Sequence, residues 1–118
     1  SKNGKFIILY NGEIYNYKIL KRKYNLKPKS NSDTEIILLL FEKFGPKMVK
    51  ELEGMFSIVI FDSHKNKCHF FRDRFGIKPI YYIKNRYQFT FSSSLNSLKK
   101  FNKNLLLRKF RWRFDINE

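Results

Sequence analysis

The first half of the chain opens with an apolar run and then turns polar. Lys5–Tyr10 is apolar after its first residue, which predicts a strand buried on both faces. Ile14–Tyr24 follows as a short basic helix. Leu26–Asn31 is polar and contains a proline, so we expect a loop there.

A longer amphipathic helix follows this loop. Ser32 is a suitable N-cap, and Glu35 stands three residues later, so we expect each side chain to bind the other's backbone N–H in a capping box. Apolar residues then recur at helical spacing until Gly45, which should end the helix. Pro46 fits the first turn of a second short helix that reaches about Leu52.

The second half changes to the period of strands. Tyr87, Phe89 and Phe91 alternate with polar residues, which predicts one apolar strand face. Short turns between the runs suggest an antiparallel meander, and the order of elements indicates an α+β fold with helices packed on an antiparallel sheet. The expected elements are strands at Met55–Phe61, Lys67–Arg72, Ile80–Ile83 and Tyr87–Ser92, and a helix at Leu95–Phe101.

Composition narrows the class of protein. The 118 residues suffice for one domain, and no apolar run approaches the ~20 residues of a membrane helix. The single cysteine, Cys68, excludes an internal disulfide and favours a reducing, cytoplasmic setting. The net charge of +15 makes nucleic acid a partner to consider. Lys and Arg are dispersed over nearly every segment, however, which argues against a dedicated binding stripe.

Asn11, Gly12 and Glu13 stand where the first apolar run ends. A side-chain amide and a glycine N–H could donate to the oxyanion that forms when an amide is hydrolysed. The other interpretation is a β-turn, because Asn-Gly is a common turn signal. The role of Asp33 also has two interpretations: it could bind a cationic substrate group or only complement the helix dipole.

The remaining polar residues favour structure over chemistry. Arg72, Asp73 and Arg74 suggest an ion-paired corner after a strand. Cys68 should face away from Lys67 and His69, as strand neighbours do, so a core cysteine is the better interpretation than a nucleophile. Neither His64 nor His69 has partners at metal-ligand spacing, and no metal site is predicted.

Four motifs in one order resemble the glutamine amidotransferase domain of the asparagine synthetases. The resemblance covers roughly Lys5 to Phe101 and implies the N-terminal-nucleophile hydrolase fold, an αββα sandwich, here incomplete. The motifs are YNGEIYNY (Tyr10–Tyr17), SDTEIILLLFEKFG (Ser32–Gly45), LEGMFSIVIFD (Leu52–Asp62) and FRDRFGIKPIYY (Phe71–Tyr82), with FTFSS (Phe89–Ser93) after them.

The resemblance implies roles for the residues at the first two motifs. Asn11 and Gly12 match the oxyanion hole for glutamine hydrolysis. Glu13 and Asp33 match acidic residues that hold the α-amino group of glutamine. In the parent enzyme the ammonia passes to a synthetase domain, which uses ATP and Mg to make asparagine from aspartate. No cofactor is expected in the present chain.

The chain also departs from the family pattern. The family's nucleophile is an N-terminal cysteine, whereas residue 1 here is Ser1, and the arginine that grips the glutamine carboxylate has no counterpart. We therefore expect residues 1–101 to be a partial amidotransferase domain that is itself inactive, followed by an unassigned basic segment, residues 102–118. The alternative is a degenerate, non-catalytic module that binds nucleic acid or another anion, with Arg108, Arg111 and Arg113 involved.

Overall fold

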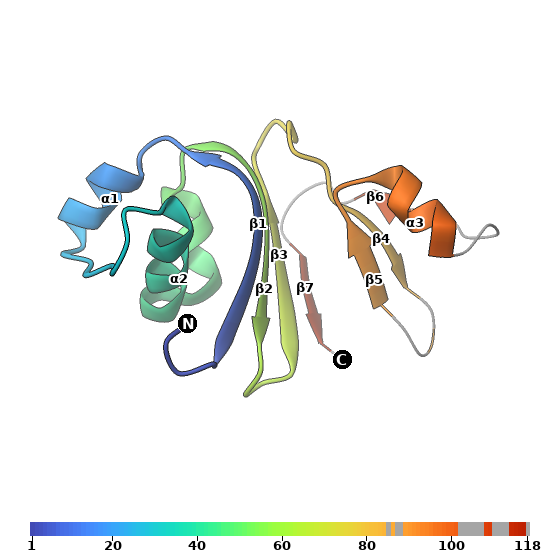
Figure 1. The fold of residues 1–118 in the computed structure, drawn as a ribbon, viewed down its shortest axis with the longest axis horizontal. Coiled ribbons are helices and arrows are strands. Elements are labelled where there is room, and N and C mark those ends of the chain that lie inside the picture. Colours follow the sequence, from blue (N-terminus) through green and yellow to red (C-terminus); the bar gives the residue numbers. More distant parts are fainter. Residues whose placement is uncertain (85, 87–88, 102–107, 110–113, 118) are drawn as a thin grey trace.

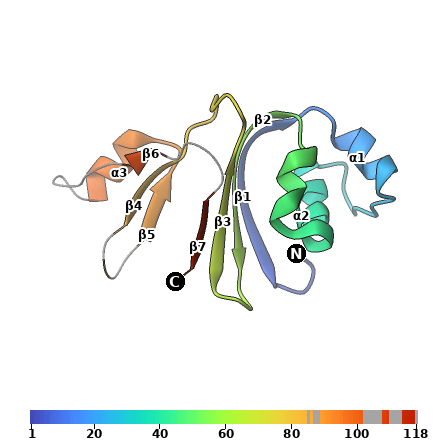
Figure 2. The same cartoon turned by 180° about the vertical axis from the view of Figure 1, so that it is seen from behind.

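The protein folds into four layers, with helices outside and two sheets inside (Figures 1 and 2). The structure, a computed structural model, describes residues 1–84, 86, 89–101, 108–109 and 114–117. One outer layer holds α1 (Tyr17–Lys23), α2 (Asp33–Phe44) and the 3-10 helix η1 (Gly45–Glu51), and the other holds α3 (Leu95–Phe101). The expected α+β fold with an αββα sandwich is confirmed.

Up to Phe101 the elements follow the predicted order, most of them with shifted ends, and two further strands, at Arg108–Lys109 and Phe114–Asn117, lie in the segment that the sequence left unassigned. Lys67–Arg72 and Leu95–Phe101 match their predicted bounds. The four-stranded sheet has the order β1-β2-β3-β7 and the three-stranded sheet the order β5-β4-β6, with every described pair antiparallel. The elements are β1 (Phe6–Ile14), α1 (Tyr17–Lys23), α2 (Asp33–Phe44), η1 (Gly45–Glu51), β2 (Gly54–Asp62), β3 (Lys67–Arg72), β4 (Tyr81–Lys84), β5 (Phe89–Ser92), α3 (Leu95–Phe101), β6 (Arg108–Lys109) and β7 (Phe114–Asn117).

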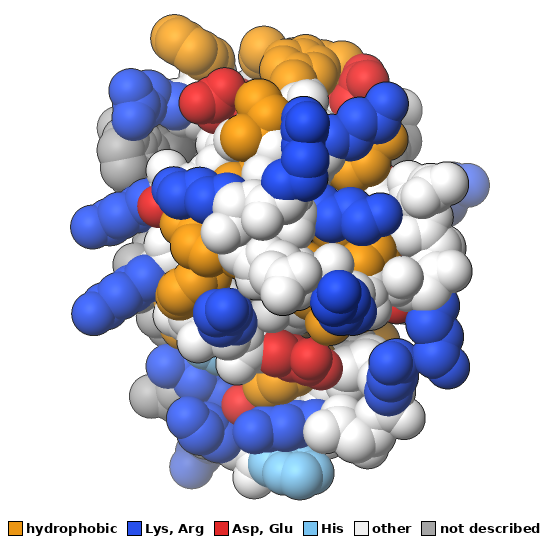
Figure 3. Space-filling model, turned by 90° about the vertical axis from the view of Figure 1, so that its left-hand side faces the viewer, with side chains coloured by type: hydrophobic (Ala, Val, Ile, Leu, Met, Phe, Trp, Pro, Cys, Tyr) orange, Lys and Arg blue, Asp and Glu red, His pale blue; other side chains and the backbone are white. Residues whose placement is uncertain are grey.

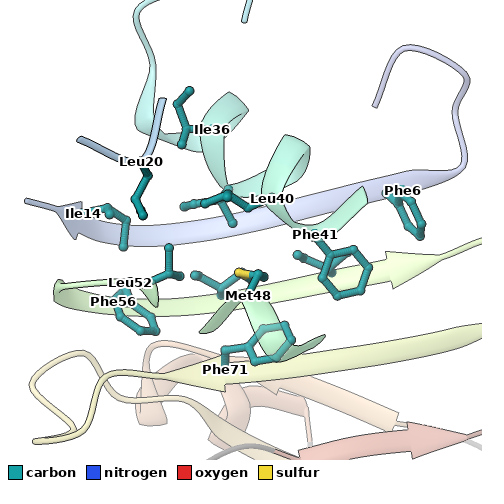
Figure 4. Packing of buried hydrophobic residues seen from close by; sticks show 13 residues of the cluster. Phe6, Ile14, Leu20, Ile36, Leu40, Phe41, Met48, Leu52, Phe56 and Phe71 are labelled. Carbon is teal, nitrogen blue, oxygen red and sulfur yellow. The ribbon is translucent and has the colours of Figure 1, made fainter. Parts of the chain in front are cut away.

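The main core lies between the four-stranded sheet and the layer of α1, α2 and η1 (Figure 4). Alternate residues of β1 and β2 point into it, and Phe41 from α2 makes edge contacts with Phe6 and Phe71. The prediction that the first strand is buried on both faces is wrong. Ile7 and Leu9 are 56% and 58% exposed, because they point away from α2 on the outermost strand of the described sheet.

The start of α2 confirms Ser32 as the N-cap, but neither hydrogen bond of the predicted Ser32–Glu35 capping box forms. Ser32 is the N-cap, and its Oγ accepts a hydrogen bond from the N–H of Thr34 at 3.2 Å. Glu35 does not reach back to Ser32. Its carboxylate accepts from the N–H groups of Lys29 and Ser30, at 2.9 and 2.8 Å, and these bonds lower its pKa. The loop before the helix is therefore fixed by Glu35.

The predicted meander is broken between β3 and β4. β2–β3 and β4–β5 are hairpins, but the chain crosses from one sheet to the other between them. The second core fills the space between the sheets, where Phe70 makes edge contacts with Phe89 and Phe91. The apolar face predicted for the strand at Tyr87–Ser92 is thus confirmed at Phe89 and Phe91 of β5. Tyr87 lies outside the described residues.

Asp73 organises the corner at which the chain leaves β3. Its side chain is only 2% exposed, and its carboxylate accepts from the N–H groups of Phe56, Ile77 and Lys78 at 3.2, 3.1 and 3.3 Å. Arg72 donates to the carbonyl oxygens of Gly76 and Lys78. Backbone groups thus satisfy both side chains, where the sequence suggested that they would pair with each other.

Candidate functional site

Asn11, Gly12 and Glu13 lie inside β1, so the turn interpretation is wrong. The strand continues to Ile14, and Gly12 stands opposite Phe56 in the ladder with β2. The φ angle of Gly12 is 143°, and a Cβ at this position would lie 2.1 Å from the carbonyl oxygen of Met55. A glycine is therefore required here because two backbones approach each other closely.

Asp33, the first residue of α2, is bound to β1 on both sides of Gly12. Its Oδ2 accepts from the hydroxyl of Tyr10 at 2.7 Å and from the N–H of Ile14 at 3.2 Å. Burial first, and then the hydrogen bond to Asp33, raise the pKa of the Tyr10 hydroxyl, so it remains a donor. The helix start and the Asn-Gly pair thus share one short stretch of β1.

Asn11 faces the other side of the sheet. A hollow of about 330 Å³ opens there between the two sheets. Its polar lining includes Asn11, Ser57, Ser92 and Ser93, its apolar lining includes Leu9, Val59, Ile80 and Phe91, and Tyr10 also lines it. Asn11 is itself exposed beside this hollow, so its amide is accessible to a ligand.

The four candidate residues surround the outer edge of β1 without sharing one hollow. The Asn11 side chain lines the inter-sheet hollow, whereas the Asp33 carboxylate lies against Tyr10 on the side of α2. Burial alternates along the whole strand, so exposed Glu13 shares the face of Asn11 rather than that of Asp33. Gly12 lies between the two faces.

Tyr10 and the N–H of Ile14 are the site groups that the sequence did not single out. Both hold Asp33, which is 23 and 19 residues away along the chain. The only available signal was that Tyr10 and Ile14 are four residues apart on one strand face. Their contact with Asp33 depends on how α2 packs on β1, which local patterns do not encode.

Cys68, His69 and Ser1 lie away from this edge. Cys68 is on β3 and packs in the inter-sheet core, whereas its neighbour His69 stacks on Phe71 in the other core. Ser1 lies at the opposite end of β1, where its Oγ accepts from the N–H of Phe6. Among the described residues, no group of three or more His, Cys, Asp or Glu is placed to hold a metal ion.

Basic side chains are spread over the helical face of the molecule rather than gathered in one stripe (Figure 3). A second hollow, of about 520 Å³, opens between α1 and the loop before α2. Lys18, Lys21 and Arg22, from successive turns of α1, line one side of it. Ser30 and Asn31 line the other side.

Solved structures share this fold. The chain superimposes over 99% of its length on 30% of the glutamine phosphoribosylpyrophosphate amidotransferase of Bacillus subtilis, with a TM-score of 0.75 and 15% identity. Its full length matches 28% of the allosteric regulatory enzyme of purine biosynthesis, with a TM-score of 0.82 and 17% identity. The fold is therefore that of an N-terminal-nucleophile amidotransferase domain.

Sequence comparison gives the family. The model of the glutamine amidotransferase domain matches residues 1–109, so the chain belongs to this family, in class II, and it is related to the asparagine synthetases. It is 42% identical over 119 residues to asparagine synthetase [glutamine-hydrolyzing] 2 of Bacillus subtilis and 38% identical over 77 residues to asparagine synthetase B [glutamine-hydrolyzing] of Escherichia coli. These matches cover 100% and 64% of the chain, but 16% and 14% of the relatives.

Within the described residues, no helix has the length and apolar character needed to cross a membrane.

Proposed function

We propose that the chain is the glutamine-binding part of an asparagine-synthetase-type amidotransferase. The parent enzyme hydrolyses glutamine and passes the ammonia to an ATP-dependent domain that converts aspartate to asparagine. The observation that carries the proposal is the binding of the Asp33 carboxylate to β1 on both sides of Gly12, through Tyr10 and Ile14. The family membership supports glutamine as the ligand.

The edge of β1 supplies donors for the carboxamide oxygen. The N–H of Tyr15 binds Glu53 across the ladder, whereas that of Ile14 binds Asp33, so alternate N–H groups point away from β2. By this alternation we infer that the N–H of Gly12 also points outward. It can donate to the oxyanion together with the Asn11 amide, as the transition state of amide hydrolysis requires.

The spacing along β1 suits a glutamine. Gly12 and Ile14 are two residues apart, so their N–H groups lie about 7 Å from each other in a strand. Five bonds separate the α-amino nitrogen of glutamine from its carboxamide oxygen, roughly 6 Å when extended. A glutamine lying along the edge can therefore place its oxygen at Gly12 and its ammonium at Asp33. Glu13 is exposed on the opposite face of the same strand, so it adds negative charge to this edge without sharing the face of Asp33.

Hydrolysis needs an attacking nucleophile, and neither the terminal Ser1 nor Cys68 is placed at this edge. Ser1 and Gly12 are at opposite parts of β1; from Phe6 to Gly12 the strand spans about 20 Å. Cys68 is on β3, across the sheet from the outer edge of β1. We infer that the chain alone binds glutamine weakly and does not hydrolyse it. ATP and Mg have their role in the synthetase part of the parent enzyme.

Glutamine binding by the 118-residue chain tests the proposal, for example by titration with L-glutamine followed by NMR. Binding in the millimolar range is expected, because the 118 residues show no counterpart of the family's arginine that grips the glutamine carboxylate. Asp33→Asn should weaken it at least fivefold, roughly 1 kcal/mol. Glu42→Gln, which removes a negative charge from an exposed position of the same helix, is the matched control. Absence of binding at about 10 mM L-glutamine would refute the proposal.

A second candidate function is the binding of an anion in the hollow beside α1. Lys18, Lys21 and Arg22 line it together with polar Ser30 and Asn31, which suits a phosphate group. Replacing the three cations by Gln should abolish binding of inorganic phosphate or of an oligonucleotide.

The matched control for this second function removes the same charge elsewhere. Lys43, Lys47 and Lys50 are exposed on α2 and η1. If their replacement by Gln weakens binding equally, the attraction comes from net charge alone.

A further inference from the structure

One carboxylate oxygen of Asp33 carries both of its hydrogen bonds. The Tyr10 hydroxyl and the Ile14 N–H donate to Oδ2 at 2.7 and 3.2 Å. Among the residues that the structure describes, nothing donates to Oδ1. A carboxylate can accept about four hydrogen bonds, so the capacity that remains is concentrated on one oxygen.

We propose that Tyr10 is a positioning residue that orients the Asp33 carboxylate for the α-ammonium group of glutamine. By holding Oδ2, it leaves Oδ1 for the ligand. It thereby makes the site selective for an amide that carries an α-amino group over the same amide without one. This inference rests on the proposed function and adds to it a residue that determines specificity.

The surroundings of Tyr10 suit this role. Its ring packs on the main core, so the direction of its hydroxyl is fixed by β1 rather than by the ligand. The Ile14 N–H alone cannot set the plane of the carboxylate, because one hydrogen bond still allows rotation about the Cβ–Cγ bond. Two donors on one oxygen, from one strand face and one strand edge, restrict that rotation, and a preorganised group loses less entropy when it binds.

The raised pKa of the Tyr10 hydroxyl determines which group donates in the hydrogen bond and where the negative charge lies. The hydroxyl keeps its proton well above neutral pH, so it donates to Asp33 and leaves the negative charge on the carboxylate. A cationic ligand group is then attracted to the negative charge of the Asp33 carboxylate, which Tyr10 helps to orient.

The test compares two tyrosines that make the same kind of bond. Tyr24 donates to Oε2 of Glu51 at 2.8 Å, away from β1, so Tyr24→Phe is the matched control for Tyr10→Phe. Both variants keep the ring and lose only the hydroxyl. The ligands are L-glutamine and glutaramate, which is glutamine without its α-amino group. Binding of each to the 118-residue chain is measured by NMR titration, with the thermal midpoint recorded for each variant.

Tyr10→Phe should weaken binding of L-glutamine about tenfold and change that of glutaramate less than twofold. Tyr24→Phe should change neither. In an Asp33→Asn background, Tyr10→Phe should add less than a twofold effect, because the group that it positions is gone. This last comparison separates positioning from a general loss of folding: a variant that merely unfolds the chain would weaken binding in the Asp33→Asn background as well.

Three results would overturn the inference. If Tyr10→Phe weakens both ligands equally, or neither, Tyr10 has a structural role only. If the unmodified chain binds L-glutamine but Tyr10→Phe binds it as well, only this inference fails and the proposed function remains. If the unmodified chain binds no L-glutamine, both fail together.

Discussion

Gly12 of β1 and Met55 of β2 approach so closely that a Cβ on Gly12 would lie 2.1 Å from the carbonyl oxygen of Met55. The neighbouring atom belongs to the backbone of a paired strand, so it cannot move without opening the ladder. The local geometry at the candidate oxyanion position and the stability of the β1–β2 strand pair are therefore coupled.

Gly12→Ala should lower the free energy of unfolding by more than about 3 kcal/mol, because it adds both a backbone clash and a residue with φ of 143°. Gly4→Ala is the control: Gly4 also has a positive φ, 66°, but a Cβ there meets nothing within 4 Å. Its cost should be about 1 kcal/mol. Urea unfolding of both variants measures the difference, and equal costs would show that the ladder yields at Gly12.

Asp73→Asn should destabilise the fold by roughly 2 kcal/mol at neutral pH, because an amide group cannot accept from all the N–H groups that the carboxylate satisfies. Burial acts to raise the pKa of Asp73, but the hydrogen bonds from Ile77, Lys78 and Phe56 outweigh it and lower the pKa below 3.8.

The sign of the pH dependence follows from this lowered pKa. The contribution of Asp73 is fully present above pH 3.8, its ordinary value, and is lost as pH falls through the lower folded value. Asp73→Asn should therefore flatten the loss of stability in acid, whereas Glu42→Gln should not. Denaturant midpoints measured from pH 2 to pH 7 test this, and parallel curves for Asp73→Asn and the unmodified chain would contradict it.

Local patterns predicted most elements of this fold but not their assembly. The N-cap at Ser32 and the end of α2 at Gly45 depend on side-chain chemistry and backbone conformation within a few residues, so they were predictable. The crossing from β3 to β4 was not, because the turn held by Asp73 depends on an N–H from Phe56, on another strand.

The candidate site shows the same division. The resemblance pointed to Asn11, Gly12, Glu13 and Asp33, but local reasoning on Asn-Gly favoured a turn. The ladder between β1 and β2 decided for a strand, since long-range pairing outweighs local turn preference when the strand covers a core. Tyr10 stayed hidden because its partner is Asp33, on a helix that only tertiary packing brings near.

Asn16→Ala should lower the free energy of unfolding by about 2 to 3 kcal/mol. The buried side chain of Asn16 donates to the carbonyl oxygen of Glu51 at 2.8 Å and accepts from the N–H of Glu53 at 3.0 Å. It thereby connects the end of β1 to the start of β2, and its loss leaves both backbone groups without a partner. Asn31→Ala, at an exposed loop position, should change stability little. Thermal unfolding of both variants measures the difference, and equal shifts would show that water replaces the Asn16 bridge.

The 118-residue chain should release no ammonia from L-glutamine above the uncatalysed background. The proposed donors at Asn11 and Gly12 would stabilise an oxyanion only after a nucleophile has attacked, and neither Ser1 nor Cys68 lies at that edge. A coupled glutamate dehydrogenase assay measures the ammonia, with the Bacillus subtilis asparagine synthetase as positive control. Cys68→Ser should leave the background unchanged. Release of ammonia that disappears in Cys68→Ser would make Cys68 the nucleophile, and release that persists would require another group at the edge of β1. Either result would contradict the expected inactivity, because catalysis needs an attacking atom within reach of the carboxamide carbon.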